Sequence, residues 1–331
     1  MTLNSFGVIG GGAWGTALAQ TLRLAGRDVV LWAREAETVA DINARHVNRT
    51  FLPGVALDPD LKASAVLKEL STADVLVMVA PAQHVRSICK LLKPHLKPNH
   101  PVVLCAKGLE QASGQMMSDI IETELPEATL AVLSGPSFAA DVARGMPAAL
   151  TLACRNEQLG RQLAERIGYK HFRLYWSNDI TGVELGGAIK NVLAIAAGIV
   201  DGKGLGASAH AALVTRGFAE LRRFGAALGA KPETMMGLSG LGDLILTCGS
   251  PQSRNMSLGR ALGQGRKLDE ILGERVAVTE GVHTAAAVVK RARELHIEMP
   301  ISEAVNAILE GRASVDDAIS ALMQRPFKAE D

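Results

Sequence analysis

A glycine-rich turn close to the start of the chain constrains the fold more than any other feature. Residues Gly10 to Gly15 read Gly-Gly-Gly-Ala-Trp-Gly, directly after the short apolar run 6–9 and directly before an amphipathic segment. In a strand–turn–helix unit, Gly10 permits the tight turn, Gly12 lets a pyrophosphate approach the backbone, and Gly15 lets the helix pack on the strand. The free N–H groups of such a helix N-terminus attract phosphate. The turn therefore predicts a dinucleotide site, and a glycine-rich turn that binds no ligand is the alternative.

Short apolar runs alternate with amphipathic segments throughout the first half of the chain. The apolar runs cover 6–9, 28–32, 75–80, 101–106 and 130–133, and helical patterns between them include 16–24, 85–92 and 115–124. This alternation predicts an α/β fold with a Rossmann-like, doubly wound and mostly parallel sheet. Two further runs at 148–153 and 171–176, joined by a helical pattern at 158–167, are expected to extend the sheet at one edge.

After residue 178 the apolar periodicity is helical throughout. Helices are expected over 179–200, 209–228, 257–262, 284–295, 302–309 and 315–322. A chain of 331 residues has room for about two domains of roughly 150 residues each. We therefore predict a dinucleotide-binding domain over 1–180 and an all-helical domain, which binds substrate and carries the catalytic groups, over 181–331.

Composition excludes several classes of function. The chain has 35 Lys and Arg against 34 Asp and Glu, and this net charge of +1 argues against a general nucleic-acid or membrane-surface binder. Its four cysteines form no C-x-x-C pair and none of the eight histidines has metal-ligand spacing, so we expect reduced thiols and no metal. We find no signal-peptide pattern, and the apolar stretch 185–200 is shorter than the ~20 residues that cross a bilayer. A cytoplasmic protein without membrane insertion is expected.

The end of the second predicted strand bears on the choice of cofactor. The apolar run 29–32 is followed by Ala33, Arg34 and Glu35. An arginine at this place attracts the 2′-phosphate of NADP, whereas an acidic residue accepts a hydrogen bond from the ribose hydroxyl of NAD. We therefore expect NADP(H) to be favoured and NAD(H) to be possible. A solvated surface arginine is the alternative.

Other strand ends carry polar residues that are expected to share one crevice. A doubly wound sheet binds its ligands beyond the carboxyl ends of its strands. Residues 81–83, 107–110 and 134–137 follow three of the predicted strands. Lys107 supplies a cation there, Ser137 a hydroxyl, and Gly135 a place where backbone comes close to a ligand.

Lys190 is an isolated charge in an apolar stretch that is predicted to be helical. It is the only charged residue between Glu184 and Asp201, and Gly186 and Gly187 lie one turn before it. Two glycines inside a helix cost about 0.8–1.0 kcal/mol each relative to alanine, which indicates that something approaches the backbone there. Desolvation disfavours the charged form of a lysine and so favours proton exchange. Lys190 is therefore a candidate catalytic group, and a lysine extending from a packed helix into solvent is the alternative.

Asp243 and a polar cluster that follows it complete the candidates. Asp243 is similarly isolated in a glycine-rich segment and could orient Lys190 or accept from a substrate hydroxyl, with a helix cap as the alternative. Ser253, Arg254 and Asn255 precede a predicted short helix. A guanidinium, a hydroxyl and an amide at a helix N-terminus suit a phosphate monoester. For Arg254 the alternative is an exposed loop residue.

Taken together, these motifs resemble the NAD(P)-dependent glycerol-3-phosphate dehydrogenases of the bacterial type. The matching segments, from Gly10 to about Glu303, read GGGAWGTAL, AKGLE, LSGPSFAADVARG, GGAIKNVLAIAAG, TRGFAE, GLSGLGDLILTC, SRN and VTEG. The segment around Lys190 is highly specific for this family. Two residues depart from the pattern: Ala13 stands where many members carry serine, and Ser208 stands where asparagine is expected.

The resemblance implies a role for each candidate. Besides the glycine-rich turn, the residues implied to contact the dinucleotide are Ala13, Trp14, Arg34, Lys107, Ala139, Arg254, Val278 and Glu280. Those implied to surround the triose phosphate are Lys107, Gly135, Ser137, Lys190, Asp243, Ser253, Arg254 and Asn255. Lys190 is implied to be the proton donor or acceptor, with Lys107 and Asp243 as the other catalytic residues.

The resemblance also implies a reaction, the reversible reduction of dihydroxyacetone phosphate to sn-glycerol 3-phosphate, which supplies glycerophospholipid synthesis. A homodimer supported by the helical half is also expected. Two alternatives stay open. A dehydrogenase of non-phosphorylated hydroxy acids would have the same layout but no need for the cluster around Arg254. A non-catalytic NADP-sensing protein would keep the glycine-rich turn, but the isolated Lys190 speaks against it.

Overall fold

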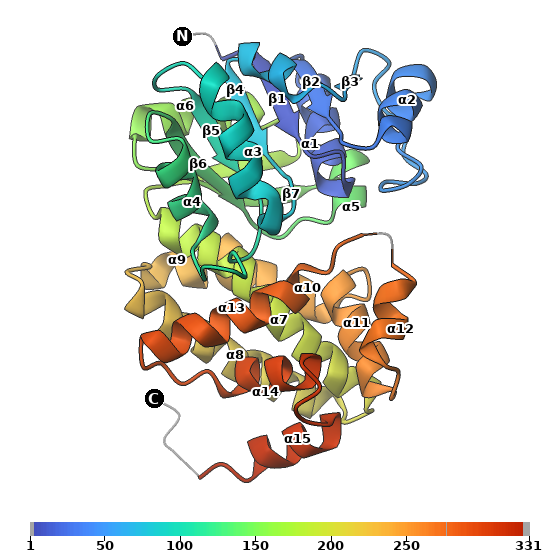
Figure 1. The fold of residues 1–331 in the computed structure, drawn as a ribbon, viewed down its shortest axis with the longest axis vertical. Coiled ribbons are helices and arrows are strands. Elements are labelled where there is room, and N and C mark those ends of the chain that lie inside the picture. The colour runs from blue at the N-terminus through green and yellow to red at the C-terminus, as the bar shows by residue number, and fades with distance from the viewer. Residues whose placement is uncertain (1–2, 276, 327–331) are drawn as a thin grey trace.

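The chain folds into a sheet-containing half and a helical half that meet end to end (Figure 1). The computed structural model describes residues 3–275 and 277–326. The sheet half is formed by the first part of the chain, and the helical half by everything that follows the last strand. The sheet half is thus a continuous segment, as the alternation of sequence patterns predicts.

One eight-stranded sheet organises the first half. Its strands are β1 (Ser5–Ile9), β2 (Asp28–Trp32), β3 (Lys62–Ser64), β4 (Val75–Met78), β5 (Pro101–Leu104), β6 (Thr129–Ser134), β7 (Ala148–Cys154) and β8 (Phe172–Ser177). They lie in the order β3-β2-β1-β4-β5-β6-β7-β8, and all neighbours are parallel except β6 and β7. The mostly parallel, doubly wound α/β fold is confirmed, with β7 and β8 extending one edge. Strand β3 was not predicted from the sequence, because its three residues, Lys-Ala-Ser, carry no apolar pattern.

Helices cover both faces of this sheet. They are α1 (Ala13–Leu24), α2 (Ala36–Arg45), α3 (Val85–Leu92), α4 (Met117–Glu124), α5 (Ala139–Ala143) and α6 (Glu157–Ile167), with short 3₁₀ turns η1 (Leu67–Thr72), η2 (Ala82–His84) and η3 (Lys93–His95). The sequence missed α2 and α5. In α2 only Thr38, Asp41 and Ile42 are buried, so its apolar stripe is weak, and α5 has five residues. The central strands β1, β4, β5 and β6 are apolar because both of their faces are buried.

The second half is helical. Its elements are α7 (Ile180–Gly202), α8 (Ala207–Ala227), α9 (Pro232–Met236), the π turn η4 (Leu238–Gly242), α10 (Asp243–Gly249), α11 (Arg254–Gly263), α12 (Leu268–Gly273), α13 (Glu280–Glu294), α14 (Pro300–Leu309) and α15 (Val315–Met323). No described residue after Ser177 lies in a strand. The expected helical second half is therefore confirmed, although α9, α10 and α12 were too short to show a pattern.

The long helix α7 forms the core of the helical half. Among the described residues it is the one helix long and apolar enough to cross a membrane, yet its most apolar window is 100% buried inside the fold. It is therefore a core helix. Its glycines let neighbouring backbone approach: a side chain at Gly186 would collide with the carbonyl of Ser239, and one at Gly198 with the carbonyl of Met256.

Three hydrophobic clusters hold the molecule together. Two lie in the sheet half, and the third fills the helical half around α7. Two residues from the connection between β5 and α4, Leu109 and Met116, belong to the cluster of the helical half. This connection therefore packs into the other half of the molecule.

Candidate active site

The glycine-rich turn forms an open helix N-terminus. Gly10 has a φ of +126°, a backbone conformation that favours glycine, and a side chain at Gly15 would collide with the carbonyl oxygen of Gly10. At Gly12, the N-cap of α1, an added Cβ would meet nothing within 4 Å. No side chain caps α1 and its first turn has no acidic residue, so its N–H groups are available to an anion. The turn fits the pyrophosphate of a dinucleotide.

The parallel strands bring the predicted strand-end residues to one edge of the sheet. Strands β1, β2, β4, β5 and β6 run in the same direction, so their carboxyl ends coincide. Gly10, Arg34, Lys107 and Ser137 follow four of these ends, and Ala82 follows a fifth. The edge where they gather faces α7 and α13 of the helical half (Figure 1).

Three predicted dinucleotide contacts lie at the N-termini of two neighbouring helices. Ala13 and Trp14 begin α1, and Ala139 is the first residue of α5, which packs against α1. Trp14 is half-buried, and its ring lies 6.4 Å from that of Phe172, measured between centroids. These residues therefore flank the open N-terminus of α1.

Arg34 is exposed and already has a partner. Its Nε and Nη2 donate to Oε1 of Glu35 at 3.1 and 2.9 Å. The side chain of Arg34 is 73% exposed and that of Glu35 is 40% exposed. A phosphate that binds Arg34 therefore competes with Glu35.

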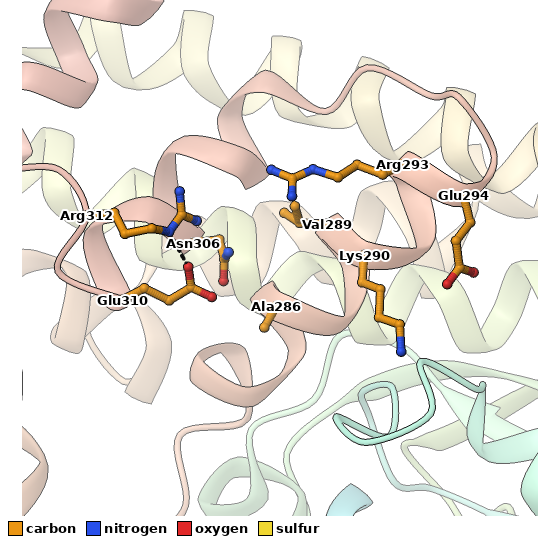
Figure 2. A pocket seen from close by; sticks show the side chains of 8 residues that line it. All are labelled: Ala286, Val289, Lys290, Arg293, Glu294, Asn306, Glu310 and Arg312. Atoms are coloured by element: carbon orange, nitrogen blue, oxygen red, sulfur yellow. Dashed lines mark hydrogen bonds and ion pairs between the residues drawn. The ribbon is translucent and has the colours of Figure 1, made fainter.

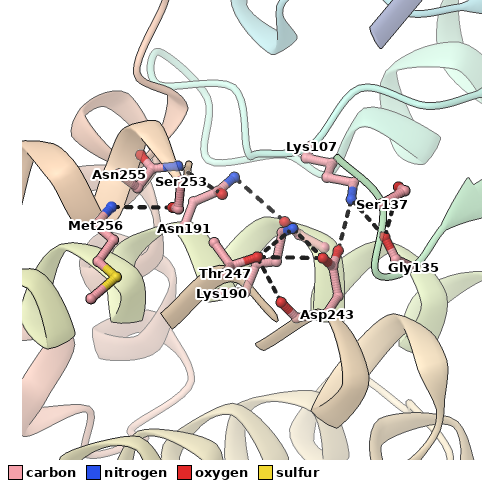
Figure 3. A network of polar contacts seen from close by, with 11 residues as sticks. Lys107, Gly135, Ser137, Lys190, Asn191, Asp243, Thr247, Ser253, Asn255 and Met256 are labelled. Carbon is pink, nitrogen blue, oxygen red and sulfur yellow. Dashed lines mark hydrogen bonds and ion pairs between the residues drawn. The ribbon is translucent and has the colours of Figure 1, made fainter. Parts of the chain in front are cut away.

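A chain of ion pairs joins the two halves of the molecule at Asp243 (Figure 3). Lys190 on α7 donates to Oδ1 of Asp243, and Lys107 at the end of β5 donates to Oδ2 at 2.7 Å. Lys190 also donates to the hydroxyl of Thr247 at 2.9 Å. Lys107 lies 3.5 Å from the carbonyl oxygen of Gly135, to which Ser137 donates at 3.1 Å. Residues separated by more than a hundred positions thus form one polar network.

The surroundings of Lys190 change its protonation. Burial lowers the pKa of Lys190 to about 7; the negative charge of Asp243 opposes this effect and the positive charge of Lys107 adds to it. An amine with a pKa near neutrality gives and takes protons readily. The alternative that Lys190 extends into solvent is wrong, because its side chain is 9% exposed.

Asp243 is the buried acceptor between the two lysines. Its side chain is 1% exposed, and it stands at the first position of α10 without capping that helix. The helix-cap alternative is therefore wrong. Thr247, four residues further along α10, lies on the same side of the helix and donates to the carbonyl of Asp243.

The predicted phosphate cluster lies at the N-terminus of α11. Ser253 is the N-cap, and its hydroxyl accepts from the N–H of Met256 at 3.2 Å. Arg254 and Asn255 are the first two residues of the helix and do not precede it as expected. Arg254 is exposed, whereas Asn255 is buried and donates to Asn191 at 2.9 Å. The side chain of Asn255 therefore also ties α11 to α7.

The N-terminus of α13 approaches the sheet half. Glu280 is its first residue and accepts from the N–H of Ala82 at 3.4 Å. Burial raises the pKa of Glu280 to about 7, against smaller opposing effects from that hydrogen bond and from the charge of Arg254. Val278 is 40% exposed just before this helix. The predicted pair 278 and 280 therefore lies where the two halves meet.

Sequence reasoning missed three residues of this network. Thr247 accepts a hydrogen bond from Lys190, and Asn191 accepts one from Asn255. Arg275 donates to the carbonyl of Arg254 at 2.6 Å. Thr247 could have been found from its spacing of four residues from Asp243 on a helix. Arg275 offered no such signal, because it precedes α13 in an irregular segment.

The described residues hold no cluster of His, Cys, Asp and Glu that could bind a metal ion. Figure 2 shows a hollow between α13 and α14, whose lining includes Lys290, Arg293 and Asn306 and no residue of the polar network around Asp243. It contains none of the residues predicted from the sequence.

Comparison with known proteins identifies the family. Models of the N-terminal and C-terminal regions of NAD-dependent glycerol-3-phosphate dehydrogenase match residues 5–160 and 179–320. The chain belongs to this glycerol-3-phosphate dehydrogenase family. It is 58% identical over 323 residues to the NAD(P)+ glycerol-3-phosphate dehydrogenase of Parvibaculum lavamentivorans, covering 98% of this chain and 97% of that protein. It is also 58% identical to the protein of that name from Caulobacter vibrioides, over 100% of both chains.

Solved structures agree with this family assignment. The crystal structure of glycerol-3-phosphate dehydrogenase from Coxiella burnetii superposes with a TM-score of 0.94 at 37% identity, covering 97% of this chain and 99% of that one. A D-mandelate dehydrogenase shares 15% identity and shows a related fold alone. The chain is therefore an NAD(P)-dependent dehydrogenase by family.

Proposed function

We propose that this protein catalyses the reversible, NAD(P)H-dependent reduction of dihydroxyacetone phosphate to sn-glycerol 3-phosphate. The observation that carries the proposal is the buried contact of Lys190 with Asp243 and Thr247, at the meeting point of the two halves. The family name of the relatives supplies the reaction, and the open N-terminus of α1 suits the cofactor.

Lys190 is the proposed general acid of the reduction. The nicotinamide ring, when bound, supplies the hydride that reduces the C2 carbonyl. Lys190 gives a proton from Nζ to the oxygen on C2 and takes it back in the reverse reaction. Its pKa of about 7 suits both directions, because a catalytic pKa near the working pH serves acid and base equally.

Asp243 and Lys107 complete the catalytic group. Asp243 holds Nζ of Lys190 in place, and Lys107 places a second positive charge on the same carboxylate. A fixed cation near the oxygen on C2 stabilises the negative charge that develops there. Gly135 and Ser137 lie beside Lys107 and line the same place, where the triose would bind.

The N-terminus of α11 is the proposed phosphate site. Arg254 offers a guanidinium, Ser253 a hydroxyl, and the helix its unpaired N–H groups. Asn255 keeps a second amide N–H besides the one it donates to Asn191. These groups would distinguish a phosphorylated triose from an unphosphorylated one.

The dinucleotide would lie across the carboxyl edge of the sheet. We assign its contacts to Gly10, Gly12, Ala13, Trp14, Gly15, Arg34, Lys107, Ala139, Arg254, Val278 and Glu280. We expect NADP(H) to be favoured over NAD(H), since Arg34 can attract the 2′-phosphate.

Further expectations concern the whole protein. We assign dinucleotide binding to 1–180 and substrate binding to 181–331. The N-terminal family model ends at residue 160 and the C-terminal one begins at residue 179, which supports a division near residue 180. By resemblance, we expect a homodimer in the cytoplasm that supplies glycerophospholipid synthesis. Light scattering on the purified protein measures the oligomeric state directly.

One assay tests the reaction. The absorbance of reduced nicotinamide is followed after mixing the protein with NADPH or NADH and either dihydroxyacetone phosphate or dihydroxyacetone. Oxidation with the phosphorylated substrate alone supports the proposal. Equal rates with both substrates would favour a dehydrogenase of unphosphorylated substrates, and cofactor binding without oxidation would indicate a sensing protein.

A further inference from the structure

The connection between β5 and α4 joins the two halves of the molecule. We call residues 107–116 the Lys107 arm. Leu109 and Met116 form an isolated antiparallel bridge within it, and both are buried in the hydrophobic core of the helical half. In Figure 1 this teal segment leaves the sheet and reaches toward α7. The arm therefore belongs to the sheet half by sequence and to the helical half by packing.

Arg86 on α3 binds the polar side of the arm. Its Nε and Nη2 donate to the two carboxylate oxygens of Glu110, each at 2.8 Å, and Nη2 also donates to Gln115 at 2.6 Å. Its Nη1 donates to Glu124 of α4 at 2.7 Å. The side chains of Arg86 and Glu110 are 25% and 13% exposed. A paired guanidinium and carboxylate of this kind fixes orientation as well as distance.

Gln83 holds the backbone of the same arm. Its Nε2 donates to the carbonyl of Leu109, and its Oε1 accepts from the N–H of Gln111, both at 2.9 Å. Within the arm, the N–H of Glu110 donates to the carbonyl of Gln115 at 2.9 Å. The arm is thus a closed loop with its polar side bound to the sheet half and its apolar side packed into the helical half.

We propose that Arg86, acting through Glu110 and Gln115, is a positioning residue for Lys107. Glu110 follows Lys107 by three residues, so a displacement of the arm at Glu110 moves the amine that contacts Asp243. The partners of Arg86 among the described residues lie on the arm and on α4, so its effect on catalysis passes through the arm. This inference rests on the proposed catalytic role of Lys107.

A double-mutant cycle on kcat tests the inference. Arg86→Ala is expected to lower kcat by on the order of 10- to 100-fold, since displacement of a catalytic group by about 1 Å costs up to 10²-fold. In the Lys107→Met background, Arg86→Ala is expected to change kcat by less than about twofold, because coupled residues are not additive. Losses that multiply in the double variant would overturn the inference, since a general structural role acts in both backgrounds.

Two further variants make the result interpretable. Arg161→Ala removes a surface pair of the sheet half, 2.8 Å to Glu157, and is expected to leave kcat unchanged. Glu110→Gln keeps the volume and one of the two hydrogen bonds from Arg86, because an amide has a single acceptor oxygen. Its loss is therefore expected to be smaller than that of Arg86→Ala; a larger loss contradicts the inference. If Arg86→Ala does not fold, Glu110→Gln carries the same cycle.

The failure of the proposed function has a different signature. If Lys107→Met alone retains full kcat, the catalytic role of Lys107 is wrong and the inference falls with it. Because Lys107 is also among the proposed dinucleotide contacts, the dissociation constant of NADPH, measured by fluorescence titration, is expected to change in Arg86→Ala by no more than it does in Lys107→Met. A larger loss of NADPH binding in Arg86→Ala would show a disrupted sheet half and contradict the positioning role.

Discussion

Two pairs of opposite charge lie at the proposed ligand sites, and their surroundings differ. Lys190 and Asp243 are buried where the halves meet, with side chains 9% and 1% exposed. Arg34 and Glu35 lie at the surface beyond β2, with side chains 73% and 40% exposed. Each pair joins a cation to a carboxylate, so a comparison of the two shows how burial changes the properties of such a pair.

The interior turns one pair into a reactive group and leaves the other as an adjustable surface contact. Burial lowers the pKa of Lys190 to about 7, while Asp243 and Thr247 hold its amine in place. Water screens Arg34 and Glu35, and an exposed pair contributes about 0–1 kcal/mol. A ligand phosphate can therefore displace Glu35, whereas nothing small displaces Asp243 without leaving a buried charge unpaired.

Replacement of Lys190 tests the buried pair most directly. Lys190→Ala is expected to abolish turnover, with kcat lower by on the order of 10²- to 10⁴-fold, because the general acid is lost. NADPH binding should survive, since the glycine-rich turn lies in the sheet half. The measurements are kcat from nicotinamide absorbance and the NADPH dissociation constant.

Lys203 provides the matched control for Lys190. It lies at the C-terminal end of the same helix, and its Nζ is 2.6 Å from Asp316 at the surface. Lys203→Ala is expected to keep full kcat. If turnover persists in Lys190→Ala, Lys190 is not part of the mechanism, and burial does not make the Lys190–Asp243 pair catalytic.

Replacement of Asp243 separates charge from position within the buried pair. Burial lowers the pKa of Lys190 and Asp243 raises it, so Asp243→Asn is expected to lower that pKa below about 7. Reduction needs the protonated amine, and its rate therefore falls as pH rises through the pKa of Lys190. The falling limb should move to lower pH, with kcat near neutrality lower by on the order of 10²-fold.

The pH dependence of kcat in both directions checks this prediction. Oxidation of sn-glycerol 3-phosphate needs the neutral amine, so its rising limb should move to lower pH as well. A limb that stays in place in Asp243→Asn, or moves to higher pH, would show that another group titrates.

The sequence identified Lys190 and Asp243 because each is an isolated charge, not because the contact between them could be predicted. Lys190 and Asp243 each stand alone in long uncharged segments, and buried charges in a stable protein must find partners. Pairing the two was left as one of several possibilities, because helix packing, not spacing, brings α7 and α10 together. Thr247 was within reach of the sequence, since it lies four residues after Asp243 on the same helix, but its contact with Lys190 depends on the packing of α10 against α7.

The local apolar pattern also determined which strands and helices could be predicted from the sequence. The central strands β1, β4, β5 and β6 are buried almost throughout, and β2, β7 and β8 still carry apolar runs, so seven strands were predicted. β3 and α2 carry too few buried residues to show a pattern. The Lys107 arm shows the other limit. Its residues lie in the sheet half by sequence, and only three-dimensional packing reveals that Leu109 and Met116 complete the helical core.

Arg254 is intermediate between the buried Lys190 and the surface residue Arg34, because it is exposed but lies at a helix N-terminus. Arg254→Ala is expected to raise the KM for dihydroxyacetone phosphate about 10- to 100-fold, since a charge-assisted hydrogen bond contributes about 1.5–3 kcal/mol. Arg260 on the same helix, 3.2 Å from Asp201, is the control, and Arg260→Ala should leave KM unchanged. An unchanged KM in Arg254→Ala would place the phosphate elsewhere.

The exposed pair should give the smallest effects, and they should have opposite signs. Arg34→Ala removes the cation that attracts the 2′-phosphate, so the ratio of kcat/KM for NADPH to that for NADH should fall. Glu35→Gln frees Arg34 from its competitor and weakens the acceptor for a ribose hydroxyl, so the same ratio should rise.

Each change is expected to be about fivefold or less, because an exposed pair contributes about 0–1 kcal/mol. Glu37→Gln, in the first turn of α2 two residues after the N-cap Glu35, is the control. Shifts in the same direction for both variants would mean that Glu35 does not compete for Arg34, and that the exposed pair acts as a unit as the buried one does.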